Sequence, residues 1–452
     1  MKFLNYFALL FVFSLGLYAQ KPIKLTLQEC VEMAYEKNIS IKQSELDLDN
    51  ASIDKADALG NFLPNFNAQG SHSWNVGLNQ NITTGLLENQ TTQFSSMGFS
   101  LGVDIYNGSQ NVNRMHRANL TLLARQYQLD DIKENVSLLV VNAYLQVLFN
   151  KELLTIQEQQ TQVSKEELER TRSLVEAGTL IKGDLYEIEA NYASQEQALI
   201  QAENALLLTR INLAQLLLIT DYENFDIADE EFEVPFSEIM QQSQKAIFTK
   251  ALSFRNDVKL AETNVSIAEK DVAISKGNLL PSIRGFYSYN TRVSYSDRLV
   301  PDGSGFAVAP PLPFADQLWI NDGQNFGLQL SVPILNGFST KNNVKRSRVN
   351  LLRVTNQLEQ QKLDLETNIN QAYNDAKGAY KFYEATNRTL ASRKEAYENA
   401  QERFNLGVIN SFDFVQVKQR YEAAVSNFLR AKYDYIFKLK VVELYFGIPI
   451  VS

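Results

Sequence analysis

The sequence predicts a protein of mixed α and β class, in which very long antiparallel helices are combined with amphipathic strands and the whole arrangement occurs twice. Three observations predict this fold. Residues 109–177 contain neither proline nor glycine, and no proline occurs between Pro333 and Pro449. Four shorter segments alternate apolar and polar residues with a period of two, as strands do. A set of breaker and turn motifs also occurs once in each half of the chain.

Residues 1–19 predict a secretory signal sequence. Lys2 precedes an apolar run from Phe3 to Leu17, and the small residue Ala19 stands before the expected cleavage point. The alternative is a membrane anchor, but the run is short for a helical span, which needs about 20 residues. The one cysteine, Cys30, lies away from this point, so it cannot carry a lipid there and cannot form an internal disulfide. We expect it to be a small core residue.

The composition excludes several functional classes. The net charge is −9, and no basic stripe is interleaved with aromatic residues, so nucleic-acid binding is disfavoured. The chain has two histidines and one cysteine, too few to build a transition-metal site or histidine-based catalysis. No catalytic, cofactor-binding or metal-binding residue is therefore predicted, and the protein is not expected to be an enzyme.

The first half, residues 20–235, predicts helices at about 26–60, 109–177 and 183–219 and strands at about 66–76 and 94–106. Thr26 is the expected N-cap of the first helix, with Glu29 as its capping-box partner and a restart of the helix at Asn38. Glycine followed by proline in Gly60–Pro64 predicts the end of this helical region. Residues 77–93 are expected to form a polar loop and residues 220–235 an acidic, solvated linker.

The second half, residues 236–452, predicts the same order of elements. Helices are expected at about 237–279, 338–406 and 411–446, strands at about 283–295 and 324–335, and a loop at 296–323. Gly277–Pro281 repeats the earlier Gly60–Pro64 stop. A single offset of 229 residues relates four further pairs: Asn107-Gly108 and Asn336-Gly337, Gly178 and Gly407, Asp184 and Asp413, and Tyr192 and Tyr421. This agreement predicts an internal duplication.

The helix expected at 338–406 carries a coiled-coil seam. Apolar and alanine residues recur there at steps of three, four or seven: Leu358, Leu365, Ile369, Ala372, Ala376, Ala379, Tyr383, Leu390, Tyr397, Ala400 and Phe404. The alanines predict a close approach of the partner helix. The opposite face is rich in Gln, Asn, Glu and Lys, which suits water or the bore of a tube.

The four strands each have one apolar and one polar face. A soluble sheet buries its apolar face in a core, whereas this alternation is also typical of barrels in a bilayer, with lipid outside and water inside. Four strands cannot close a barrel, because the smallest membrane barrels need 8. Such a chain would have to pool its strands with copies of itself. The alternative is a pair of soluble hairpins packed on helices.

The order of these motifs and their doubling resemble the TolC-like outer membrane efflux protein family over essentially the whole mature chain. The residues that carry the resemblance are Leu25–Glu29, the two Gly-Asn-X-Leu-Pro stops, the two Asn-Gly turns, and the two helix-hairpin tips at 178–184 and 407–413. The resemblance implies a homotrimer with a transmembrane β-barrel of 12 strands, four from each chain, and a coiled-coil α-helical barrel in the periplasm. It further implies a duct in the outer membrane that exports drugs, metals or proteins together with a periplasmic adaptor and an inner-membrane pump.

The resemblance also implies roles at the two tips. Asp184, Asp413, Phe404 and Lys182 are the candidates for a gate at the periplasmic end, where three copies of each aspartate would form a negative ring that favours cations. The alternative for the aspartates is stabilisation of a helix N-terminus, worth about 0.3 to 1 kcal/mol. The chain departs from the family pattern where Ile409 replaces a gating arginine and Gln416 replaces an acid, so a salt-bridged latch is not expected at the second tip.

The tips are also the expected docking points for the adaptor, through exposed backbone and small apolar contacts at Gly178, Thr179, Leu180, Gly407, Val408 and Ile409. The alternative function is that of a secreted coiled-coil scaffold or adhesin, which would explain the helices but not the strands. An enzyme using paired carboxylates such as Glu166 and Glu167 is a weaker alternative, because charge runs of this kind are expected on solvated helix faces.

Overall fold

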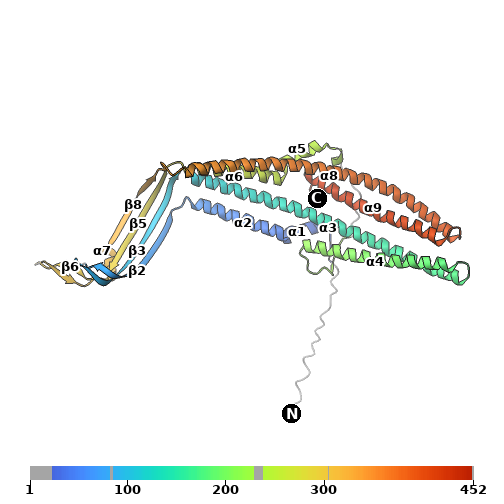
Figure 1. Ribbon diagram of the computed structural model, residues 1–452, viewed down its shortest axis with the longest axis horizontal. Helices are drawn as coiled ribbons and strands as arrows, with labels where there is room; N and C mark the ends of the chain where they lie inside the picture. The colour runs from blue at the N-terminus through green and yellow to red at the C-terminus, as the bar shows by residue number, and fades with distance from the viewer. Residues whose placement is uncertain (1–22, 82–84, 229–237, 304, 450–452) are drawn as a thin grey trace, which may run out of the picture. The chain divides into compact units, whose positions relative to one another are not determined.

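The computed structural model describes residues 23–81, 85–228, 238–303 and 305–449 (Figure 1). The expected signal sequence at 1–19 lies outside the described residues. The chain divides into two compact units. The first unit comprises residues 1–45, 129–256 and 362–452, and the second comprises residues 46–128 and 257–361.

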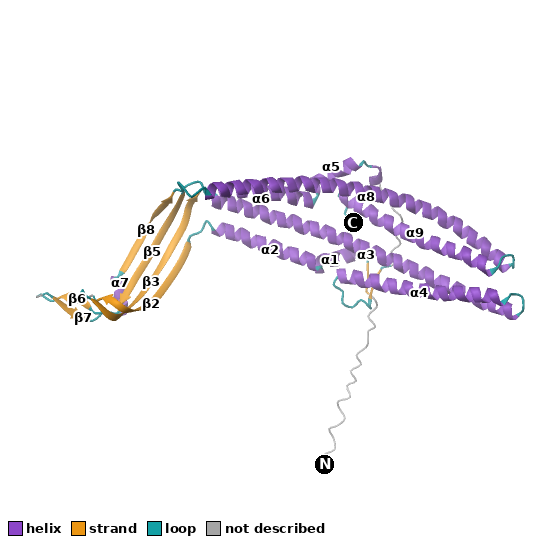
Figure 2. Ribbon diagram, in the orientation of Figure 1, coloured by secondary structure: helices purple, strands orange, loops and turns teal. Residues whose placement is uncertain are grey.

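The first unit is built mainly of helices, drawn in purple in Figure 2. They are α1 (Leu27–Lys37), α4 (Lys182–Leu216), α5 (Gln244–Phe254), α9 (Ser411–Phe446), the 3-10 turn η1 (Glu238–Gln241) and parts of α2 (Ile39–Gly60), α3 (Gln110–Glu176) and α8 (Ser339–Asn405). The prediction of two very long helices is confirmed, since α3 and α8 have 67 residues each. Both helices also contribute residues to the second unit. Among the described helices, none is both long enough and apolar enough to cross a membrane.

The predicted start of the first helix is confirmed. Thr26 caps α1, and its side chain and that of Glu29 form the reciprocal hydrogen bonds of a capping box. Cys30 is fully buried, as expected for a core residue. The helical region is interrupted at Asn38, whose extended backbone separates α1 from α2 (Ile39–Gly60). Arg255 has the same conformation between α5 and α6 (Asn256–Gly277), so both interruptions are single residues.

The predicted seam of α8 lies on its buried side. Leu365, Ile369 and Ala376 are almost completely buried. Tyr383 stacks on Tyr435 of α9 at 6.3 Å between ring centroids. Complete burial of a Leu or Ile side chain contributes about 1.5 to 3 kcal/mol to the free energy of folding. The seam therefore accounts for the association of α8 with α9, although both helices are polar on their other faces.

The acidic segment 220–235 is not simply a solvated linker. Phe225–Ile227 forms a short strand, β4, that pairs in parallel with β1 (Ile23–Leu25), and Phe225 and Ile227 are buried. Lys151 donates to the Asp226 carboxylate at 2.9 Å. The prediction was wrong for these residues because two apolar side chains among the acids carry the packing. Residues 229–235 of the segment lie outside the described residues.

The second unit contains a four-stranded antiparallel sheet, drawn in orange in Figure 2. Its order is β2 (Asn65–Gln80), β3 (Leu87–Asn107), β5 (Ser282–Ser294) and β8 (Asp322–Ser331). The pairing confirms one apolar and one polar face. Phe66, Leu101 and Tyr287 are directly opposed across three strands on the apolar face, and the next row of Asn67, Ser100 and Ser288 lies on the polar face. The outer strands of this described sheet are β2 and β8.

The two loops between the strands are shorter than predicted. Pairing of β2 with β3 continues to Gln80 and Leu87, so most of the expected polar loop at 77–93 is strand. The expected loop at 296–323 contains a small hairpin of β6 (Arg298–Pro301) and β7 (Phe306–Ala309), followed by the helix α7 (Phe314–Ile320). The polar composition of residues 77–93 concealed the ends of β2 and β3. The strands β6 and β7 have 4 residues each and α7 has 7, too few for a hydrophobic period to show.

Two of the sequence motifs meet beside the sheet. Gly108 of the Asn-Gly turn has a positive φ of 66°, and a Cβ there would lie 2.2 Å from the carbonyl oxygen of Gly277, the first residue of the helix stop. A Cβ on Gly277 would in turn lie 2.7 Å from the carbonyl oxygen of Gly108. Only glycine fits at either position, because the opposing atoms belong to the backbone. The contact therefore fixes the junction of β3 with α3 against the end of α6.

Candidate functional site

The candidate site lies at the two helix-hairpin tips of the first unit. The α3–α4 connection begins at Ala177, and the α8–α9 connection begins at Leu406. Gly178 and Gly407 have positive φ values of 79° and 72°. Both helices end in the same pattern, with Thr179 N–H donating to Leu174 O at 2.9 Å and Val408 N–H donating to Arg403 O at 2.8 Å. These are Schellman motifs, which need a left-handed residue and favour glycine.

The predicted tip residues fall into two groups. Gly178, Thr179, Gly407 and Val408 are exposed, as a docking surface requires. Leu180 and Ile409 are partly buried, and Ile409 packs against the hydrophobic cluster described next. Leu406, which begins the second tip, is 79% exposed, and Phe412, an apolar residue for which the sequence predicted no docking role, is 59% exposed.

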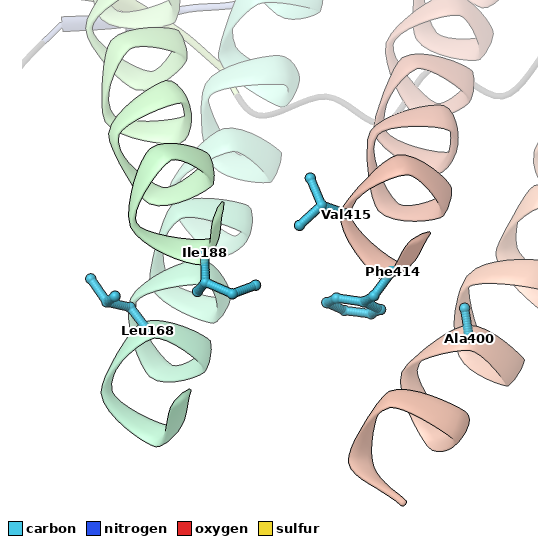
Figure 3. Close-up of a cluster of buried hydrophobic side chains, with 5 residues drawn as sticks. All are labelled: Leu168, Ile188, Ala400, Phe414 and Val415. Atoms are coloured by element: carbon cyan, nitrogen blue, oxygen red, sulfur yellow. The ribbon is translucent and has the colours of Figure 1, made fainter. Parts of the chain in front are cut away.

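A hydrophobic cluster lies directly behind the tips and receives side chains from all four helices (Figure 3). Leu168 comes from α3, Ile188 from α4, Ala400 from α8, and Phe414 and Val415 from α9. Phe404, a predicted gate residue, stacks on Phe414 with ring centroids 4.7 Å apart and planes within 5°. In this chain Phe404 is therefore a packing partner of the cluster.

The predicted gate residues differ in their surroundings. Asp184 accepts a hydrogen bond from the Ser411 hydroxyl at 2.6 Å, which connects the first turn of α4 with the first turn of α9. Asp413 is exposed, and its backbone N–H donates to the Asn410 side chain at 2.8 Å as part of the α9 N-cap. Lys182 is also exposed. The structure thus brings Asp184 into a contact between the hairpins and leaves Asp413 and Lys182 toward solvent.

A second contact at the same level joins the hairpins. The Arg170 guanidinium of α3 donates to the Asn405 side-chain oxygen at the end of α8. Neither residue was predicted. Both side chains are exposed, so they are not part of the periodic pattern that identified the seam.

A polar layer lies next to the hydrophobic cluster and is centred on Lys418 of α9. Lys418 is 2% exposed, and its ammonium group donates to the Ser164 hydroxyl at 2.6 Å and to the Glu167 carboxylate at 2.8 Å. The expectation that Glu167 lies on a solvated face was wrong, because its side chain is 14% exposed and ion-paired across to α9. Glu166 is exposed as predicted. Lys418 lies one turn after Phe414 and Val415. The signal in the sequence for this buried ion pair was therefore a lysine that continues the apolar stripe of α9.

Glu422, one turn further along α9, belongs to the same layer. Gln195 of α4 donates to its carboxylate at 2.9 Å, and Gln157 of α3 donates to Gln195 at 2.6 Å. Burial raises the pKa of Glu422 above its usual value, and the nearby Glu167 carboxylate raises it further, while Lys418 and Gln195 act in the opposite direction. Burial is also the main cause that raises the pKa of Tyr397, which packs on the cluster from α8.

The polar layer is incompletely hydrogen-bonded among the described residues. Glu167 Oε1, Asn191 Nδ2 and Glu422 Oε1 are buried without a protein partner. Unpaired buried groups cost about 1 to 3 kcal/mol each, so this layer is less stable than the apolar cluster beside it. The arrangement holds the two hairpins together. The described residues contain no group of three or more His, Cys, Asp or Glu that could hold a metal ion.

Comparison with known proteins identifies consistent relatives. A family model described as "Outer membrane efflux protein" matches residues 30–217 and 247–441. The outer membrane protein TolC of Vibrio cholerae is 23% identical over 376 residues, which cover 80% of each chain. The CmeC outer membrane channel of Campylobacter jejuni is similar in structure, with a TM-score of 0.79 and 18% identity over 93% of this chain and 85% of that one. VceC of Vibrio cholerae has a TM-score of 0.75 and 14% identity over 93% and 96%.

Proposed function

The chain belongs to the outer membrane efflux protein family, and on that premise we propose that it is one subunit of a homotrimeric outer membrane channel. The channel would be a passive exit duct, with its helices in the periplasm, for substrates delivered by an inner-membrane pump and a periplasmic adaptor. The observation that carries this proposal is the four-stranded sheet with one apolar face, one polar face and two outer strands, β2 and β8. Open sheet edges do not persist in hydrocarbon, so such a sheet needs copies of itself.

The glycines beside the sheet support closure between copies. Gly108 and Gly277 meet inside the chain, where β3 pairs with β5. Their counterparts in the proposed duplication are Gly337 and Gly60, which stand next to the outer strands β8 and β2. Gly337 has the same left-handed backbone as Gly108, with φ of 59°. Among the described residues, however, no atom lies within 4 Å of a Cβ built on either Gly337 or Gly60. We infer that each meets the corresponding glycine of a neighbouring subunit.

The same correspondence predicts the register of the junction between subunits. Ser100 is directly opposite Ser288 in the β3–β5 pair. Ser100 corresponds to Gln329 by the offset of 229 residues that relates the Asn-Gly turns, and Ser288 corresponds to Ser71 by the offset of 217 residues that relates Gly277 to Gly60. We therefore expect Gln329 of one subunit to lie opposite Ser71 of the next. The transferred pairing keeps the apolar residues of β8 and β2 on one common face, as closure of an amphipathic barrel requires.

Cysteine cross-linking tests both the trimer and the register. In a Cys30→Ser background, the variant Gln329→Cys/Ser71→Cys is expected to give covalently linked subunits on mild oxidation, because opposed strand residues have Cα atoms about 4.5 to 5.5 Å apart. The matched control is Gln329→Cys/Ser73→Cys, which is displaced by two residues on the same face. Failure of the protein to form trimers in detergent or membranes would refute the proposed function. Cross-linking of the control pair alone would refute only the register.

The tips are the proposed gate and docking region. Three copies of Asp184 and Asp413 would surround the periplasmic opening, with Phe404 and Lys182 beside them, and the exposed residues Gly178, Thr179, Gly407 and Val408, together with the partly buried Leu180 and Ile409, would contact the adaptor. The contact of Asp184 with Ser411 and that of Lys418 with Glu167 support a closed arrangement of the two hairpins. Such an arrangement does not need the gating arginine that Ile409 replaces. This proposal places closure within each subunit.

A further inference from the structure

The helix α7 is held on the apolar face of the sheet by hydrogen bonds to the backbone. The Gln317 side chain is 6% exposed; its amide nitrogen donates to Ser294 O at 3.0 Å, and its oxygen accepts from Ser294 N–H at 2.9 Å. The Thr291 hydroxyl donates to Leu318 O at 2.9 Å. Gln317 therefore pairs with β5 as a strand residue would, and α7 is fixed against the sheet.

The fixed helix presents large apolar side chains outward. Trp319 is 78% exposed and Ile320 is 64% exposed. Between α7 and the strands lies a depression of about 550 Å³, lined mainly by apolar side chains that include Phe66, Phe99, Tyr289 and Trp319. An exposed apolar patch of this kind indicates a surface that contacts another protein or a membrane.

Both tryptophans of the chain gather on this face. Trp74 of β2 is 61% exposed and packs edge-on against His72 with ring centroids 4.2 Å apart. His72 also contacts Tyr295 at 5.5 Å and hydrogen-bonds the Ser95 hydroxyl at 2.8 Å. Amphipathic aromatic side chains of this kind are typical of the headgroup zone of a bilayer, where one end of the ring is apolar and the other is wet.

The height of these residues agrees with that zone. Ile283 is the first apolar residue of β5 on this face, and at about 3.4 Å per residue Thr291 lies about 27 Å and Tyr295 about 41 Å further along the strand direction. A strand tilt of about 35 to 45° reduces these lengths to about 20 and 31 Å. The apolar band of membrane barrels is about 25 Å tall, so its upper edge falls between the levels of Thr291 and Tyr295, where α7 and Trp74 lie.

We propose that α7 is a lipid-contacting anchor that holds Trp319 and Ile320 in the headgroup zone of the leaflet at the β5–β8 connection, the end of the sheet opposite to Gly60 and Gly277. The inference rests on the proposed function, since it takes the apolar face of the sheet to lie against lipid. It assigns a membrane surface as the partner of the segment between β5 and β8. Gln317 is the positioning residue for that contact.

Tryptophan fluorescence tests this assignment, because each single substitution leaves one reporter. The full mature protein is reconstituted in phosphatidylcholine vesicles whose acyl chains are brominated either near the glycerol end or near the terminal methyl. In Trp319→Phe the signal reports Trp74, and in Trp74→Phe it reports Trp319. We expect both signals to be quenched, and more strongly by bromine near the glycerol end. In Trp74→Phe/Gln317→Ala, the lipid quenching of Trp319 is expected to be lost and quenching by aqueous iodide to rise.

The two reporters separate the possible failures. If Trp74 is quenched by brominated lipid but Trp319 responds only to iodide, the role of α7 is refuted while the membrane location of the sheet stands. Stronger quenching of Trp319 by terminal bromine would also refute the headgroup assignment. If neither tryptophan responds to lipid, the proposed function fails together with the inference.

Discussion

Replacement of Lys418 by methionine removes the cation from the polar layer behind the tips and keeps the length of the side chain. Glu167 then loses its ion pair at 2.8 Å, and Ser164 loses the ammonium donor at 2.6 Å. A buried carboxylate without its partner is strongly destabilising, because the desolvation of the charge is no longer offset. Lys418→Met is therefore expected to destabilise the contact between α9 and α3.

The magnitude follows from the geometry. At 2.8 Å and an effective dielectric constant of about 20, the gross attraction is about 6 kcal/mol, much of which the desolvation of Lys418 offsets. Breaking a buried pair by removing one partner costs about 3 to 5 kcal/mol. The Glu167 side chain is 14% exposed and can reach water after the substitution, so we expect the lower end, about 3 kcal/mol.

A double-mutant cycle measures the interaction. Lys418→Met, Glu167→Gln and the double variant are unfolded with denaturant in detergent at one fixed protein concentration, and the helical signal is followed by circular dichroism. The double variant is expected to be more stable than the sum of the single effects predicts, by about 2 kcal/mol or more. Additivity within about 0.5 kcal/mol would show that the two groups do not interact and would refute the assignment of the polar layer.

Three further predictions concern the same end of the molecule. Because the pKa of Glu422 is raised, the contribution of its protonated carboxyl group to the free energy of unfolding is fully present below the usual pKa of 4.5 and is lost as pH rises through the folded-state pKa. Glu422→Gln should therefore stabilise the protein at neutral pH and give little gain in stability at pH 4.5. An equal gain at both pH values in unfolding experiments would contradict this. Asp184→Asn/Asp413→Asn should lower the cation selectivity of single channels toward unity without loss of trimers, since the amide keeps the acceptor for the contact at the tip; unchanged selectivity would exclude the negative ring. Gly407→Asp should abolish transport in cells. The control Gly378→Asp, on a face of α8 where no described atom lies within 4 Å of a new Cβ, should not. Transport that survives Gly407→Asp in intact trimers would show that this tip is not part of the docking surface.

The parts of the fold with a repeated pattern could be predicted from the sequence. The long helices follow from the absence of breakers, the seam of α8 from its period, and the faces of the sheet from alternation, and each is present in the structure. The capping box at Thr26 was predictable because it is local, with both partners within one turn. Patterns of this kind lie within one segment of the chain, so they can be recognised without knowing which other segment lies beside it.

The missed features depend on how separate segments meet. The strand β4 has three residues, too few to show a period, and it exists because β1 lies beside it. The contact of Ser411 with Asp184 joins residues 227 positions apart, and that of Lys418 with Glu167 joins residues 251 apart. One sequence shows which face of a helix is apolar but not which polar residue of a second helix stands opposite. For this reason the tips were predicted and the polar layer behind them was not.

The two glycine pairs beside the sheet have different genetic consequences. A larger residue at Gly277 collides with backbone of its own chain, so the altered subunit should fail to fold and be removed, and a normal copy of the gene should compensate. A Cβ at Gly60 has no atom within 4 Å in the part of the chain that the structure describes, so the subunit should fold and still offer an intact β8 edge to normal neighbours. Each such subunit would leave one junction of the ring unmade. Substitutions at Gly277 are thus expected to be recessive, and those at Gly60 dominant.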